Sequence, residues 1–114
     1  MKVLLADDQT LFRKAIAAYL SSYPEIKIVG EAEDGLQAVE KAEQLHPDLI
    51  LMDINMPGCD GLEATRKIKA ILPDIKIVML TISDDDEDLF EAIKSGAQGY
   101  LLKNMRPEEL LEYM

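Results

Sequence analysis

The segment Leu49-Ile50-Leu51-Met52-Asp53 is the most informative part of the sequence, because four consecutive apolar residues are followed at once by a carboxylate. A short run that is apolar throughout is typical of a strand buried on both faces of a parallel sheet. A carboxylate is rarely placed beside a core without a partner. The stretch therefore predicts a central strand with a functional polar group at its end.

Four further runs of strand character flank this one, and longer amphipathic stretches separate them. The runs are Lys2–Ala6, Lys27–Glu31, Lys76–Leu80 and Gly99–Leu102, and the central run itself covers Leu49–Met52. Strands that alternate with helical patterns in this way are typical of an α/β domain in which helices cover a parallel sheet. We therefore expect one domain with a five-stranded parallel sheet.

The stretches between the strands carry apolar residues at helical spacing, which predicts four helices. Pro73 and Gly96 mark the ends of the third and the fourth. Pro107 suits the first turn of a fifth helix, which has room for only about two turns before Met114. Because this helix is shorter than the others, we expect it to be truncated and a larger protein, with an output domain, to continue beyond it.

The composition is that of one ordinary globular domain, with 114 residues, 48% hydrophobic and 30% charged. Twelve basic and 22 acidic side chains give a net charge of −10. Such a surface disfavours direct contact with nucleic acid or an anionic membrane and favours a cationic partner or a bound cation. No apolar stretch approaches the roughly 18 residues of a membrane span and no signal peptide is evident, so we expect a cytoplasmic protein. The single cysteine, Cys59, excludes an intrachain disulfide.

Polar residues gather where the predicted strands end, which is where open parallel sheets bind their ligands. The residues are Asp7-Asp8, Asp53, Thr81 and Lys103. Three carboxylates in one place would repel one another unless a cation lay among them, and hard oxygen ligands favour Mg²⁺. Mg²⁺ with few protein ligands usually also binds phosphate oxygens, and a hydroxyl and an ammonium group suit the remaining oxygens. The group therefore predicts a phosphoryl-transfer site.

Asp53 is the candidate acceptor, because it stands alone after the central strand and a carboxylate can form an acyl phosphate. Asp7 and Asp8 are better suited to hold the metal. Each residue taken singly has a simpler explanation. The aspartate pair could cap the first helix, Thr81 could be an ordinary strand former, and Lys103 could be a solvated strand end. These separate explanations do not account for all five residues occurring together at the predicted strand ends.

The same residues make the chain similar to the receiver domain of bacterial two-component response regulators over essentially its whole length, residues 1–114. The residues that carry the resemblance are Asp7-Asp8, Asp53 within Leu51-Met52-Asp53-Ile54-Asn55-Met56-Pro57, Asp60-Gly61, Thr81 and Lys103. Residues 8–13 and 28–32 resemble most the subfamily whose output is a C-terminal helix-turn-helix of the NarL/LuxR type. The resemblance implies a flavodoxin-like (CheY-like), doubly wound sheet of strand order 2-1-3-4-5. The output domain is absent from these residues.

The resemblance also implies how the site works. Asp53 would accept a phosphoryl group from the phosphohistidine of a partner sensor histidine kinase, and the changed domain would control transcription through its DNA-binding output. Asp8, Asp53 and the backbone carbonyl of Asn55 would bind Mg²⁺. Asp7 would reach the ion through water. A phosphorylation-dependent homodimer is a further expectation, whereas direct contact of this domain with DNA is not expected.

Five residues take roles from the same resemblance or from their place beside the site. Thr81 would bond one phosphoryl oxygen and Lys103 would pair with another. Tyr100, three residues before Lys103, would be the aromatic switch that turns inward as Thr81 moves. Asn55 and Ser83 would control how water reaches the acyl phosphate and hence the phosphoryl lifetime.

One residue departs from the family pattern. Many receivers follow the lysine with a proline through a cis peptide bond, whereas this chain has Asn104. We nevertheless expect the Lys103–Asn104 bond to be cis, at a cost of about 2.5–4 kcal/mol that the surrounding loop would have to bear.

Three other classes of protein share parts of the pattern. A phosphatase or mutase of the haloacid dehalogenase type also uses an aspartyl nucleophile after a strand, but it would need an acid where Asn55 stands and a cap insertion. A flavodoxin would need a loop rich in Ser, Thr and Gly where Asp7-Asp8-Gln9 stands. An inactive interaction module would keep the fold alone, yet every acidic and basic site residue is present. We therefore expect a regulatory phosphoacceptor that assists its own phosphorylation and dephosphorylation.

Overall fold

Five parallel strands form the centre of the computed structural model, which describes residues 1–82 and 86–112. The strands are β1 (Lys2–Ala6), β2 (Lys27–Ala32), β3 (Leu49–Asp53), β4 (Lys76–Thr81) and β5 (Gly99–Leu102). Their order is β2-β1-β3-β4-β5, and all neighbouring pairs are parallel, which confirms the predicted sheet. Asp53 and Thr81 are the last residues of their strands rather than the first residues of the following loops.

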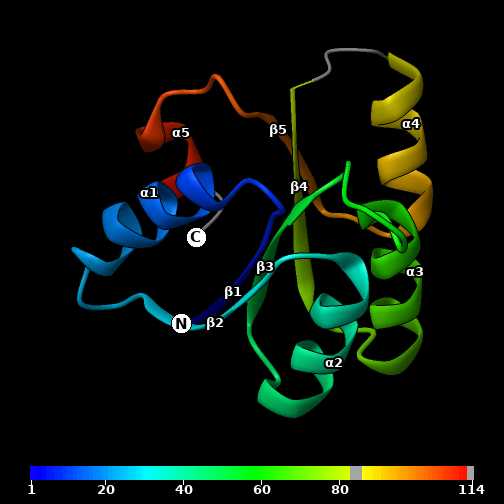
Figure 1. Cartoon of the computed structure of the whole chain (residues 1–114), viewed down its shortest axis with the longest axis horizontal. Helices are drawn as coiled ribbons and strands as arrows, with labels where there is room; N and C mark the ends of the chain where they lie inside the picture. The colour runs from blue at the N-terminus through cyan, green and yellow to red at the C-terminus, as the bar shows by residue number, and fades with distance from the viewer. Residues whose placement is uncertain (83–85, 113–114) are drawn as a thin grey trace.

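Within the described ranges, four helices connect the strands, a fifth follows the last strand, and together they cover both faces of the sheet. They are α1 (Thr10–Ser21), α2 (Gly35–Leu45), α3 (Gly61–Ile71), α4 (Asp86–Ser95) and α5 (Pro107–Leu111). Figure 1 shows α1 and α5 on one face and α2, α3 and α4 on the other, which is the doubly wound arrangement. None of these helices has the length and apolar character needed to cross a membrane.

Two apolar clusters hold the layers together, one on each face, because successive side chains of a strand point to opposite sides of the sheet. The cluster under α1 and α5 contains Val3, Leu5, Leu49, Leu51, Val78 and Leu80 together with Ile16, Leu20 and Leu110 of the helices. The opposite cluster contains Leu4, Ile50, Met52, Ile77 and Met79 together with Ala38, Ala64 and Ala92. β3 is buried throughout, whereas all four residues of the edge strand β5 are only partly buried.

Aspartate side chains cap the N-termini of α2 and α3 but not that of α1. Asp34 and Asp60 cap α2 and α3, accepting hydrogen bonds from the backbone N–H groups of Gln37 and Glu63 at 2.8 and 2.9 Å. The N-cap of α1 is Gln9, whose side chain makes no capping hydrogen bond. Helix capping therefore does not explain the aspartate pair that precedes Gln9.

Candidate functional site

Three aspartates meet at the carboxyl edge of the sheet, where the paired strands β1 and β3 end side by side. Asp7 and Asp8 follow β1, and Asp53 is the last residue of β3. One carboxylate oxygen of each lies within 4.8 Å of the others. Asp7 and Asp53 are each 3% exposed, while Asp8 is open to solvent. The fold thus brings together the three acids that the sequence singled out.

The ammonium group of Lys103 lies against the two buried carboxylates. Its Nζ is 2.8 Å from Oδ2 of Asp7 and 3.3 Å from Oδ2 of Asp53, and its side chain is only 7% exposed. The same Nζ donates a hydrogen bond to Oε1 of Gln9 at 2.7 Å and lies 4.8 Å from the centre of the Phe12 ring. Gln9, which precedes α1, and Phe12, in its first turn, therefore help to hold the Lys103 ammonium beside the carboxylates.

Asp53 holds its proton more tightly than an ordinary aspartate does. Its pKa is raised from 3.8 to about 7, first because burial disfavours the charged form and second because the carboxylate of Asp7 repels it. The ammonium of Lys103 and the backbone N–H of Asn55, 3.3 Å from Oδ1, act in the opposite direction. One ammonium group does not balance the three acids, so the site carries excess negative charge.

The donor set fits a hard divalent cation. Oδ1 of Asp7 accepts a hydrogen bond from the N–H of Gln9 at 2.7 Å, whereas Oδ2 is buried without any hydrogen bond, although the Lys103 ammonium is at ion-pair distance. The carboxylate of Asp8 has no hydrogen bond or ion pair to any residue that the structure describes. An open pocket of about 200 Å³ lies beside these groups, lined by Asp8, Gln9, Asp53, Asn55, Ile82 and Lys103. Carboxylate oxygens with room for several waters are the environment that Mg²⁺ prefers.

The remaining predicted residues lie at different distances from this pocket. Thr81 is buried at the end of β4, and its carbonyl accepts a hydrogen bond from the N–H of Lys103 at 2.7 Å. Asn55 lines the pocket. Tyr100 packs against the apolar cluster on the α2, α3 and α4 face and is not among the residues that line the pocket. Ser83 lies outside the described residues.

Sequence reasoning missed three residues of the site. Gln9 and Phe12 contact Lys103, and Ile82, 77% exposed, forms part of the pocket wall. Gln9 and Ile82 directly follow residues that were singled out, so their position at the sheet edge was available from the sequence. The contact with Phe12 was not, because it requires that the lysine after β5 reaches across to α1.

The expected cis bond before Asn104 is wrong. No peptide bond between residues that the structure describes is cis, so the Lys103–Asn104 bond is trans. Asparagine lacks the ring that makes cis and trans nearly equal for proline, and the trans form of an ordinary peptide bond is favoured by about 2.5–4 kcal/mol.

Gly61 fixes the main chain of Asp53 from the side of α3. Its N–H donates to the carbonyl of Ile54 at 2.8 Å, and a Cβ at this position would collide with the backbone carbonyl of Asp53. Gly61→Ala is therefore expected to lower the free energy of unfolding by about 2–3 kcal/mol in denaturant titrations. Gly58→Ala is the control, because Gly58 has a φ of +70° but open space around it. We expect it to cost about 1 kcal/mol, and equal losses in the two variants would contradict the role of the collision.

The fold and the site together define a class of protein. It is the flavodoxin-like α/β domain whose acidic site lies where the strand order reverses, between the ends of β1 and β3. Comparison with protein families matches residues 3–114 to the response regulator receiver domain. The chain belongs to this family, whose members are regulatory phosphoacceptors rather than classical enzymes.

Curated relatives agree with the expected subfamily. The chain is 46% identical over 110 residues to the nitrate/nitrite response regulator protein NarL of Escherichia coli K12, which covers 96% of this chain and 51% of the relative. It is 44% identical over 112 residues to the transcriptional regulatory protein LiaR of Bacillus subtilis 168, which covers 98% of this chain and 53% of the relative. The chain thus spans about half the length of the curated relatives it matches.

Solved structures confirm the receiver fold. The response regulator domain of Thermotoga maritima CheB superposes with a TM-score of 0.92 at 34% identity, covering 99% of this chain and 92% of that one. A DNA-binding response regulator of the LuxR family from Staphylococcus aureus superposes with a TM-score of 0.91 at 28% identity, covering 97% of this chain and 92% of that one.

Proposed function

We propose that this receiver domain, residues 1–114, is a phosphorylation switch in which Asp53 accepts a phosphoryl group from the phosphohistidine of a sensor histidine kinase. The convergence of Asp7, Asp8 and Asp53 within 4.8 Å, in a chain of the receiver family, carries the proposal. Lys103 adds the positive charge that a phosphoryl oxygen requires. The cytoplasm, where such kinases present their phosphohistidine, is the proposed place of action.

Mg²⁺ is the proposed cofactor. Asp8, Asp53 and the backbone carbonyl of Asn55 would hold it, and Asp7 would act on it through a water. When bound, the ion neutralises the excess carboxylate charge and the charge on the phosphoryl oxygens. The open pocket beside Asp8 leaves room for the waters that Mg²⁺ retains.

The transfer step forms one bond and breaks another. A carboxylate oxygen of Asp53 bonds to phosphorus while the phosphorus–nitrogen bond to the kinase histidine breaks, and the imidazole leaves with the electron pair. The Lys103 ammonium, 3.3 Å from Oδ2 of Asp53, is placed to pair with a phosphoryl oxygen. Asn55 lines the pocket through which water enters, so this residue and Ser83 control the lifetime of the acyl phosphate and thereby its self-catalysed hydrolysis.

The switch then passes to the other half of the protein. The hydroxyl of Thr81 bonds a phosphoryl oxygen, Tyr100 turns inward, and the face of α4 changes its preference for partners. Since the curated relatives are about twice as long and include a transcriptional regulatory protein, the proposed output is a C-terminal DNA-binding domain. The net charge of −10 makes DNA contact by the receiver itself unfavourable. The active form of the phosphorylated domain is proposed to be a homodimer.

Treatment with acetyl phosphate and Mg²⁺ tests the proposal. The intact mass is expected to rise by one phosphoryl group, and removal of Mg²⁺ by a chelator is expected to prevent the gain. Beryllofluoride, which mimics the phosphoryl group, is expected to shift the amide resonances of Thr81 and Tyr100. Absence of both responses in the folded protein would instead favour a phosphorylation-inactive interaction module.

A further inference from the structure

Arg13 is a buried charge to which the proposed function gives no role. It lies on the buried side of α1 together with Ile16 and Leu20, and only 5% of it is exposed. Removing a guanidinium from water is costly unless partners replace the lost hydration. The hydrogen-bond partners of Arg13 therefore indicate its structural role.

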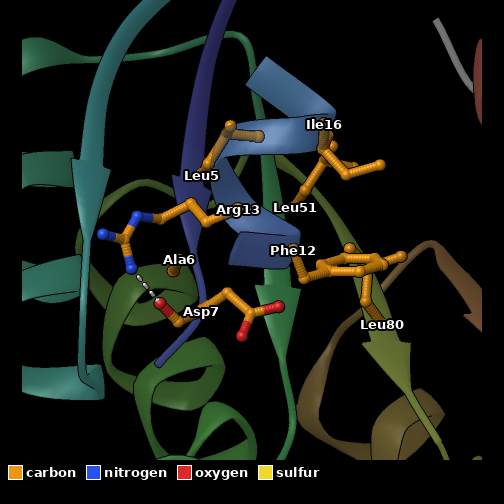
Figure 2. A pocket seen from close by; sticks show the side chains of 8 residues that line it. All are labelled: Leu5, Ala6, Asp7, Phe12, Arg13, Ile16, Leu51 and Leu80. Carbon is orange, nitrogen blue, oxygen red and sulfur yellow. Dashed lines mark hydrogen bonds between the residues drawn. The ribbon is translucent and has the colours of Figure 1, made fainter. Parts of the chain in front are cut away.

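Those partners join the end of β1 to the end of β2. Nη1 donates a hydrogen bond to the backbone carbonyl of Asp7 at 2.6 Å, and Nε donates to Oε1 of Glu31 in β2 at 2.7 Å. A third carboxylate, that of Glu33, lies 3.7 Å from Nη2. Figure 2 shows the bond to the Asp7 carbonyl as a dashed line, with the carboxylate of Asp7 pointing away from the guanidinium. Arg13 thus holds the main chain of the acidic pair and makes no hydrogen bond or ion pair with their carboxylates.

The main chain decides where Asp8 points. Its carboxylate has no hydrogen bond or ion pair to any described residue, so only the backbone at the Asp7–Asp8 peptide, which sets the direction of the Cα–Cβ bond of Asp8, aims the side chain. The N–H of Asp7 is fixed by the carbonyl of Ala32 at 3.0 Å. The carbonyl on the other side of Asp7, which belongs to the linking peptide, is fixed by Arg13.

We propose that Arg13 is a positioning residue for the divalent cation, because it anchors the Asp7–Asp8 peptide to Glu31 and so keeps the Asp8 carboxylate directed into the pocket. The inference rests on the proposed function, which supplies the cation. Glu31 remains a charged anchor at neutral pH. Partial burial raises its pKa, but hydrogen bonds from Arg13 and Lys14 outweigh this and lower it.

The direction in which Mg²⁺ affinity changes when Arg13 is removed distinguishes a positioning role from a purely electrostatic one. Arg13 is a positive charge close to a cation site, so its removal would strengthen Mg²⁺ binding if only charge mattered. A positioning role predicts the opposite, since a loosened Asp7–Asp8 peptide lets Asp8 turn away from the ion. Replacing residues that orient metal ligands typically costs about 10–100-fold in metal affinity.

Titration of the unphosphorylated protein with Mg²⁺, followed by the amide resonances of Asp8 and Asn55, tests the inference. Arg13→Met is expected to raise the Mg²⁺ dissociation constant at least about tenfold. Arg13→Lys, which can reach one partner but does not span both, is expected to fall between Arg13→Met and the wild type. Lys14→Met is the control, because Lys14 pairs with the same Glu31 at 3.1 Å but lies on the surface. Its dissociation constant is expected to stay within twofold of wild type.

A double variant separates positioning from folding. Arg13→Met leaves Glu31 as a partly buried charge without its main partner, which could destabilise the fold. Combining it with Glu31→Gln removes that charge, while the hydrogen bond to the Asp7 carbonyl stays absent. The double variant is expected to be folded and still weak in Mg²⁺ binding. Affinity equal to or tighter than wild type in either folded variant would overturn the inference. If the wild type itself bound no Mg²⁺, the proposed function would fail first.

Discussion

Asp53→Asn is expected to abolish phosphoryl uptake and, in the absence of Mg²⁺, to make the domain more stable. The amide cannot form an acyl phosphate, so the intact mass after treatment with acetyl phosphate should remain that of the unmodified chain. The gain in stability has a separate cause. Asp53 and Asp7 are both buried, and the substitution removes one of two repelling buried charges while Lys103 keeps its contact with Asp7 at 2.8 Å.

This stability gain depends on pH with a defined sign. Because the folded state raises the pKa of Asp53 from 3.8 to about 7, the folded state binds more protons than the unfolded state between these values. The wild type therefore loses stability as pH rises through this range. Asp53→Asn does not, and it is expected to be more stable than wild type by about 4 kcal/mol at pH 8 and nearly equal at about pH 4.

Denaturant titrations in the presence of a chelator measure this difference at both pH values. Asp34→Asn provides the control, because Asp34 caps α2 away from the site and asparagine caps as well as aspartate does. We expect that variant to stay within about 0.5 kcal/mol of wild type at both pH values. Equal stability of wild type and Asp53→Asn at pH 8 would show that the carboxylates are not in repulsion.

Lys103→Met is expected to destabilise the metal-free domain strongly. The methionine can fill the space over Phe12, but Asp7 and Asp53 lose the ammonium that lies 2.8 and 3.3 Å from them. Removal of one partner from a buried ion pair typically costs about 3–5 kcal/mol, because the remaining charge is left uncompensated. The cost is expected to grow as pH rises, since loss of the ammonium raises the pKa of Asp53 further. Thermal unfolding at pH 5.5 and pH 8, without metal, measures it.

Two comparisons identify the cause of that loss. Lys94→Met removes another lysine that lies over a phenylalanine ring and near a glutamate, but on the exposed surface of α4. We expect it to cost less than about 1 kcal/mol. Combining Lys103→Met with Asp53→Asn is expected to restore much of the stability, because a single buried carboxylate then remains. A double variant as unstable as Lys103→Met would mean that the lysine acts through packing rather than charge.

The sheet and the acidic cluster could be predicted because both follow from local patterns. The apolar runs of β1, β3 and β4 are buried on both faces, which leaves little choice of structure. Once the strands are parallel, their carboxyl ends share one edge, so the acids after β1 and at the end of β3 lie on the same side of the sheet. That β1 and β3 are direct neighbours, which brings Asp7, Asp8 and Asp53 together, followed from the family resemblance.

Other features depend on contacts between distant segments. Helical spacing marked the helices but not which residues they bury: Leu11 is 88% exposed and Phe90 60%, while Ala92 is fully buried. The hydrogen bonds of Arg13 to Asp7 and Glu31 could not be predicted from the sequence either, since an arginine in an amphipathic helix ordinarily faces solvent. Its burial depends on a carbonyl after β1 and a carboxylate in β2 lying within reach of the same turn of α1.

The position of β5 at the sheet edge sets the order in which the site comes apart. Among the residues that the structure describes, β5 pairs only with β4, and its four residues are partly exposed, so local opening of this strand is expected to require less free energy than global unfolding. Such an opening is expected to carry Lys103 away while the acids stay anchored on the buried strands β1 and β3. We therefore expect native-state amide exchange to divide the site into two cooperative units, with the cation ligands in the slowly exchanging unit and the ammonium in the rapidly exchanging one.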